Sequence, residues 1–195
     1  LRGDAPATQK QFKPDIDGNA HAVDLVKQVS NLNKGIYLEE GLENAHPTNF
    51  CIGVAGYPEK HPEAPNLESD LLNLKAKVDA GAEYIITQLF FDNQKYFEFV
   101  KRCRSAGINV PIIPGLKPLS TKNQLIALPQ TFHVDIPQEL ASEVQKCKSK
   151  QAVYELGIEW GIAQSKELIA AGAPVLHYYT MGKSDNIRQI AKAVF

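Results

Sequence analysis

The stretch that decides the fold is SDLLNLKAKVDAGAEYIITQLFFD, residues 69–92. Its first half places Leu71, Leu74 and Val78 at helical spacing, and Gly81 is typical of the residue that ends a helix. The run that follows, 83–90, is rich in β-branched and aromatic residues and predicts a buried strand. A helix that leads into such a strand is half of a βαβ unit, so this stretch predicts a parallel α/β sheet.

The same alternation extends outward through most of the chain. Apolar runs predict strands at 50–57, 83–90, 110–116 and 174–180. Amphipathic patterns predict helices at 19–31, 67–80, 92–106, 120–128, 137–147, 150–171 and from Ser184 or Asp185 onward. Asn66 and Asp92 are the expected N-caps of two of these helices, and Cys103 is expected in the core. No linker divides the pattern, so residues 1–195 are expected to form a single domain.

Two architectures fit this pattern. Strand starts at 50 and 83 are one βα unit apart, and the helix at 19–31 requires a strand before it. We therefore expect a (β/α)8 TIM barrel of which this chain covers roughly the second half, strands 5 to 8 and their helices. The alternative is an open flavodoxin-like sheet of four or five parallel strands, which needs no further strands to complete its layers.

Composition and charge exclude several classes of protein. Lys plus Arg number 21 and Asp plus Glu 22, so no basic field exists to hold nucleic acid or anionic lipid. No apolar run approaches the roughly 18 residues of a membrane span. Three cysteines without a CxxC pair favour a reducing, cytoplasmic setting. The five histidines are dispersed and predict no metal site.

Polar residues fall where the predicted strands end, which is where parallel α/β proteins carry their sites. They are Asp4, Tyr57 and His61, the helical row Asp70, Asn73 and Lys77, then Gln88 and Lys183, and the small Ala55 lies at the same strand end as Tyr57. Residue type alone leaves a plainer interpretation open at each place. Asp4 fits a turn, His61 a surface position, the helical row a solvated face, and Gln88 a polar end to the core.

An ordered series of motifs resembles the methylenetetrahydrofolate reductase family. The series is LRGD at 1–4, AGYPEKHPEA at 55–64, the stretch 69–92, IIPGLKPLS at 112–120 and HYYTMGK at 177–183. The resemblance implies a barrel that holds FAD at its carboxyl face. It also implies reduction of 5,10-methylenetetrahydrofolate to 5-methyltetrahydrofolate with NADH or NADPH, in one-carbon metabolism and methionine biosynthesis, by an enzyme expected to be a homo-oligomer.

The resemblance also implies a role for each matched residue. The cofactor-binding positions are Leu1, Arg2, Gly3, Asp4, Ala55, Tyr57, His61, Asp70, Asn73 and Lys77. Asp4 further matches the aspartate near the flavin that influences folate reduction, and is the one catalytic assignment. The substrate-binding positions are Gln88, which matches the glutamine that hydrogen-bonds the pterin, then Gln124 and Lys183.

Several departures from the family pattern bear on this interpretation. Ala76 replaces a basic residue, Leu128 a phenylalanine that stacks on substrate, and Lys183 an arginine whose bidentate fork is lost. The family's acid, a glutamate on the first barrel strand, has no counterpart in these residues, so the isolated chain is expected to be inactive. Two other functions remain open: a non-catalytic half-barrel or interaction module, and another flavin barrel such as a proline dehydrogenase.

Overall fold

The computed structural model describes residues 12–195, so Leu1, Arg2, Gly3 and Asp4 lie outside the described residues. Its strands are β1 (Gly53–Gly56), β2 (Tyr84–Leu89), β3 (Ile112–Leu116) and β4 (His177–Tyr178). Its helices are α1 (Ala22–Leu32), α2 (Leu67–Asp79), α3 (Asn93–Ser105), α4 (Gln124–Phe132), α5 (Gln138–Lys146), α6 (Lys150–Ala170) and α7 (Asp185–Val194). Each predicted element is present, with two differences. The helix predicted at 120–128 lies four residues later, at Gln124–Phe132, and the strand expected at 174–180 contains only two residues.

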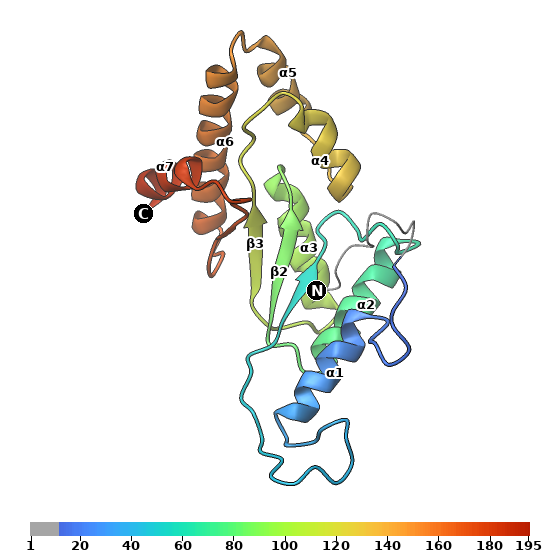
Figure 1. Ribbon diagram of the computed structural model, residues 1–195. Helices are drawn as coiled ribbons and strands as arrows, with labels where there is room; N and C mark the ends of the chain where they lie inside the picture. Colours follow the sequence, from blue (N-terminus) through green and yellow to red (C-terminus); the bar gives the residue numbers. More distant parts are fainter. Residues whose placement is uncertain (1–11) are drawn as a thin grey trace.

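The strands form one parallel sheet in the sequential order β1-β2-β3-β4. In Figure 1 the arrows of β1, β2 and β3 lie side by side and α3 lies behind β2. Doubly wound sheets of the flavodoxin type reverse their strand order at a switch point, whereas barrel strands follow one another around the ring. The parallel α/β prediction is confirmed, and the sequential order favours a barrel segment over the open flavodoxin-like alternative.

The two faces of the sheet differ in how they are covered. Val54, Ile85 and Ile112 are buried against α2, α3 and α6 in the main hydrophobic core. The alternate row stays only half-buried at Tyr84, Ile86, Gln88, Ile113 and Ala55. Alternation along each strand therefore separates a helix-covered face from an uncovered face.

A second hydrophobic core lies beyond the carboxyl ends of the strands. Leu89 and Phe91 from the end of β2 pack there with residues of α4, α5 and α6. Figure 1 shows α4 and α5 beyond the arrowheads of β2 and β3. Leu128 is 5% exposed and belongs to this core, so its side chain stabilises the helical cover of the sheet.

Local capping explains why the two best-predicted helices begin and end where they do. The Asn66 side chain accepts a hydrogen bond from the Ser69 N–H at 2.8 Å, and Asp92 accepts one from the Gln94 N–H at 2.9 Å. Gly81 and Gly107 follow these helices with positive φ of 121° and 75°, which favours glycine. Among residues 12–195, no helix is both long enough and apolar enough to cross a membrane.

Candidate functional site at the carboxyl ends of the strands

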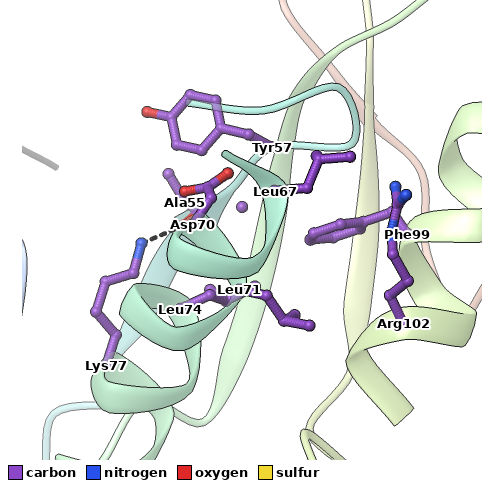
Figure 2. Close-up of a pocket in the computed structure, with 10 residues that line it drawn as sticks. Ala55, Tyr57, Leu67, Asp70, Leu71, Leu74, Lys77, Phe99 and Arg102 are labelled. Carbon is purple, nitrogen blue, oxygen red and sulfur yellow. Dashed lines mark hydrogen bonds between the residues drawn. The ribbon is translucent and has the colours of Figure 1, made fainter. Parts of the chain in front are cut away.

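Lys77 of α2 connects this helix to the end of β1. Its Nζ donates a hydrogen bond to the Ala55 carbonyl oxygen at 2.7 Å, drawn as a dashed line in Figure 2. Burial lowers the pKa of Lys77 below its usual 10.5, and the nearby Asp70 carboxylate opposes that shift. A half-buried cation is therefore held beside a strand end, with the Asp70 carboxylate about two helical turns away on α2.

Asp70 and the loop before α2 form the second part of the same site. Asp70 Oδ2 accepts a hydrogen bond from the His61 backbone N–H at 2.9 Å. The rings of Tyr57 and His61 meet edge to face with centroids 4.6 Å apart. The loop is thus fastened to the helix, and Tyr57 projects above the first turn of α2 in Figure 2.

These residues line a small pocket between α2 and α3. Ala55, Tyr57, Asp70 and Lys77 lie in its wall. Figure 2 shows Arg102 approaching from α3, on the other side from Lys77. Arg102 Nη2 donates to the Pro58 carbonyl oxygen at 3.3 Å, so α3 also holds the loop.

Sequence analysis did not identify Arg102 as part of the site. Nothing in its local pattern separates it from the other basic residues of α3, because its partner Pro58 is 44 residues away.

Asn73 is the member of the helical row with the most exposed position. It lies on α2 between Asp70 and Lys77 in the sequence and is exposed to solvent. An exposed amide offers both a donor and an acceptor to a ligand. The structure thus brings five of the predicted cofactor residues around one strand end, Ala55, Tyr57, His61, Asp70 and Lys77, with Asn73 beside them.

The glycines near this strand serve packing. A Cβ at Gly53 would lie 2.2 Å from the Tyr84 ring, and one at Gly56 would lie 2.8 Å from Ile85 and 2.9 Å from Phe99. The space left by both glycines is therefore occupied by the protein's own side chains.

A β-bulge positions Gln88 at the carboxyl end of β2. Pairing runs Ile86 with Ile113 and then Leu89 with Gly115, so β2 contains one extra residue. The Thr87 hydroxyl accepts the Gly115 N–H at 2.9 Å, and Gln88 Oε1 accepts the Leu89 N–H at 2.9 Å. At the bulge these side-chain oxygens accept backbone N–H groups in place of the regular hydrogen bonds between β2 and β3.

Gln88 lies on the uncovered face of the sheet, in the row of Tyr84 and Ile86, as the period of two predicts. Tyr179, the residue after β4, supports the bulge, because its hydroxyl donates to the Thr87 carbonyl oxygen at 2.9 Å. The sequence did not predict this hydrogen bond between Tyr179 and Thr87. The one available signal was Gly115, since a glycine inside a strand often marks a bulge.

The other two predicted substrate residues lie on separate elements. Gln124 begins α4, and its Oε1 accepts the N–H groups of Ser120 at 2.7 Å and Thr121 at 3.2 Å. Lys183 is exposed in the turn after β4. Both follow strands of the sheet, but the structure does not bring their side chains together with Gln88 as it does the residues around Lys77.

Fold and site together define a parallel α/β protein whose candidate site residues lie at the carboxyl ends of its strands, the usual location of enzyme sites in this class. The chain matches the model of the methylenetetrahydrofolate reductase family over residues 1–194. It belongs to that family.

Curated relatives agree with this assignment. A probable methylenetetrahydrofolate reductase (NADPH) of Caenorhabditis elegans is 41% identical over 74% of this chain and 22% of its own length. Methylenetetrahydrofolate reductase (NADH) 1 of Arabidopsis thaliana is 39% identical over 93% of this chain and 30% of its own. The 5,10-methylenetetrahydrofolate reductase of Pectobacterium carotovorum is 34% identical over 95% of this chain and 55% of its own length. The chain therefore spans about half of this bacterial relative and less than a third of the two eukaryotic ones.

Proposed function

We propose that this chain is part of a flavin-dependent oxidoreductase that reduces 5,10-methylenetetrahydrofolate to 5-methyltetrahydrofolate with NADH or NADPH. The observation that carries the proposal is the bulge that sets Gln88 at the carboxyl end of β2, on the uncovered sheet face, in a chain that matches the reductase family. Bulges next to active sites re-aim side chains, and an amide at such a position suits a flat heterocycle.

The residues around Lys77 fit the FAD that the family resemblance implies. FAD contains a diphosphate, and a half-buried ammonium beside an exposed amide is suited to bind one. Tyr57 adds an aromatic ring at the same strand end. We assign Ala55, Tyr57, His61, Asp70, Asn73 and Lys77 to FAD, with Leu1, Arg2, Gly3 and Asp4 completing the site.

When bound, FAD would accept hydride from the nicotinamide and deliver it to the folate. The protein's own part is to position the reactants. The Gln88 amide nitrogen donates to the pterin while its oxygen keeps the Leu89 N–H and retains a second lone pair. The oxygen of Gln124 likewise accepts backbone N–H groups, so its amide nitrogen can donate to the substrate. Lys183 binds an anionic group of the substrate. Asp4 favours a cationic form of the folate.

The test is to purify the complete protein and identify the cofactor that it releases. We expect a yellow protein whose flavin chromatographs as FAD, because the residues around Lys77 suit the diphosphate that FMN lacks. Anaerobic NADH or NADPH should bleach the bound flavin, and 5,10-methylenetetrahydrofolate should restore its colour. Release of FMN contradicts the cofactor assignment, and bleached flavin that the folate cannot reoxidise contradicts the reaction.

A further inference from the structure

A second cavity, of about 590 Å³, lies outside the site described above. It opens between the start of α3, the start of α5 and the middle of α6. Its lining residues are Phe91, Asp92, Asn93, Pro137, Gln138, Glu139, Trp160, Ala163, Gln164 and Glu167. None of these has a role in the proposed reductase function, and a cavity of this size is typical of small-molecule sites.

Asn93 is the polar residue of this cavity whose bonding the chain leaves incomplete. It is 6% exposed, and its Nδ2 donates to the Gln164 carbonyl oxygen at 3.1 Å and to Glu167 Oε2 at 2.6 Å. Two acceptors fix which end of the amide is the nitrogen. The other end, Oδ1, is buried without a hydrogen-bond partner. A hydrogen-bond donor on a ligand in the cavity would supply the partner that this oxygen lacks.

Trp160 gives the cavity an aromatic wall. Its Nε1 donates to the Phe91 carbonyl oxygen at 3.2 Å, which anchors one edge of the indole. Trp160, Ala163, Gln164 and Glu167 follow one another at i, i+3, i+4 and i+7 on α6, so they share one face of that helix.

The charge of the lining has one sign. Asp92, Glu139 and Glu167 are acidic, and the ten lining residues include no lysine, arginine or histidine. An indole ring next to carboxylates is a favourable setting for an organic cation, because the ring face and the carboxylates both attract positive charge.

We propose that this cavity binds a small organic molecule with a guanidinium group. A guanidinium has a planar fork that pairs with a carboxylate such as Glu167, additional N–H groups for Asn93 Oδ1, and a flat face that stacks on Trp160. A primary ammonium is a more strongly hydrated point charge and matches fewer of these features. This site is independent of the proposed folate chemistry.

The experiment titrates the complete protein with agmatine, by calorimetry and by tryptophan fluorescence. Trp160 is the single tryptophan of these 195 residues, and a Trp160→Phe variant isolates its signal. We expect saturable binding that weakens with salt, a change in Trp160 fluorescence, and about a tenfold or greater loss of affinity in Glu167→Gln. Glu159→Gln is the matched control, since Glu159 is exposed on the same helix and outside the cavity.

Three outcomes would overturn the proposal. They are agmatine binding that does not saturate, equal losses in the Glu167 and Glu159 variants, and binding of pentylamine as tight as that of agmatine. Circular dichroism of the variants separates lost binding from lost folding. Agmatine binding should be unchanged in Lys77→Met, so a failure of the reductase proposal and a failure of this one are distinguishable.

Discussion

Lys77 donates its hydrogen bond to the carbonyl oxygen of Ala55, 22 residues earlier, and so fastens α2 to the end of β1. The contact holds an ammonium group where the backbone of a strand ends and where Asp70 also lies. A cation in that position can both bind an anionic ligand and stabilise the fold. Experiments can separate these two roles.

We predict that Lys77→Met loses FAD far more readily than it loses stability. A charge-assisted hydrogen bond typically contributes about 1.5–3 kcal/mol, so the apparent Kd for FAD should rise about tenfold or more. The methionine loses the bond to Ala55 but keeps the apolar part of the side chain and removes the cost of burying an ammonium. We therefore expect the free energy of unfolding to change by about 1 kcal/mol or less. Lys75→Met, on the same helix, is the control for FAD retention and should leave it unchanged.

The pH dependence of stability should identify the same lysine. Because burial lowers the pKa of folded Lys77 below 10.5, the unfolded chain binds the proton more readily between the two values. Its contribution to stability therefore rises as pH increases through that window. Denaturant unfolding across alkaline pH should show that the free energy of unfolding of the wild type increases relative to that of Lys77→Met. A difference in free energy of unfolding that stays constant or decreases with pH would contradict the lowered pKa of Lys77.

Gln88→Glu should damage folate reduction more than flavin reduction. The glutamate keeps an oxygen for the Leu89 N–H and so preserves the bulge, but it removes the amide donor. Losing one polar contact to a substrate typically costs about 1–3 kcal/mol, which is roughly fivefold or more in rate. Stopped-flow measurement of the two half-reactions checks this, with Gln94→Glu, at an exposed position of α3, as control. Equal losses in both half-reactions would show that Gln88 does not contact the folate selectively.

Two glycines of α6 should respond differently to alanine. A Cβ at Gly157 would lie 1.8 Å from the Leu119 carbonyl oxygen, which is backbone and cannot yield easily. At Gly161 the nearest atom is 2.7 Å away and is the flexible end of Ile190. Overpacking typically costs about 1–3 kcal/mol, so Gly157→Ala should be destabilised by at least that amount. Gly161→Ala should change less, because the end of the Ile190 side chain can shift, whereas the gain in helix propensity of up to about 1 kcal/mol is common to both variants. Thermal unfolding of both variants compares them directly.

The three cysteines should react with thiol reagents in a defined order. Cys51 is exposed, Cys147 is half-buried, and Cys103 is fully buried. Burial also raises the pKa of Cys103 to about 11, which suppresses the reactive thiolate. In native protein at pH 8 we expect Cys51 to be modified first and Cys103 only after unfolding. Mass spectrometry of timed digests provides the measurement.

We also predict the behaviour of residues 1–195 expressed alone. The uncovered sheet face carries half-buried Tyr84, Ile86 and Ile113, and such apolar surface favours association. Size-exclusion chromatography should show self-association, and added FAD, NADH and folate should give no reduction. A stable monomer with reductase activity would contradict both the half-barrel interpretation and the expectation that these residues lack a counterpart of the family's acid.

Local sequence determined the elements of this protein and their class. The leucine spacing of 67–80, the N-caps Asn66 and Asp92, and the positive-φ glycines act over a few residues, so pattern alone located α2 and α3. Alternation in β2 likewise placed Gln88 on the same face as Tyr84 and Ile86. The roles of the site residues came from the resemblance to a family, since the residue types alone left plainer interpretations open.

Tertiary structure decided what depends on contacts between distant segments. The one-residue bulge beside Gln88 depends on Thr87, Gly115 and Tyr179, which lie on three different strands or their ends. Arg102 joins the site through a backbone oxygen of a distant loop, and the Asn93 amide is arranged by α6. Hydrophobic period and capping act within one element and can be read along the chain. Pairing register and side-chain partners are set only when the elements pack, because each depends on atoms that the local sequence does not contain.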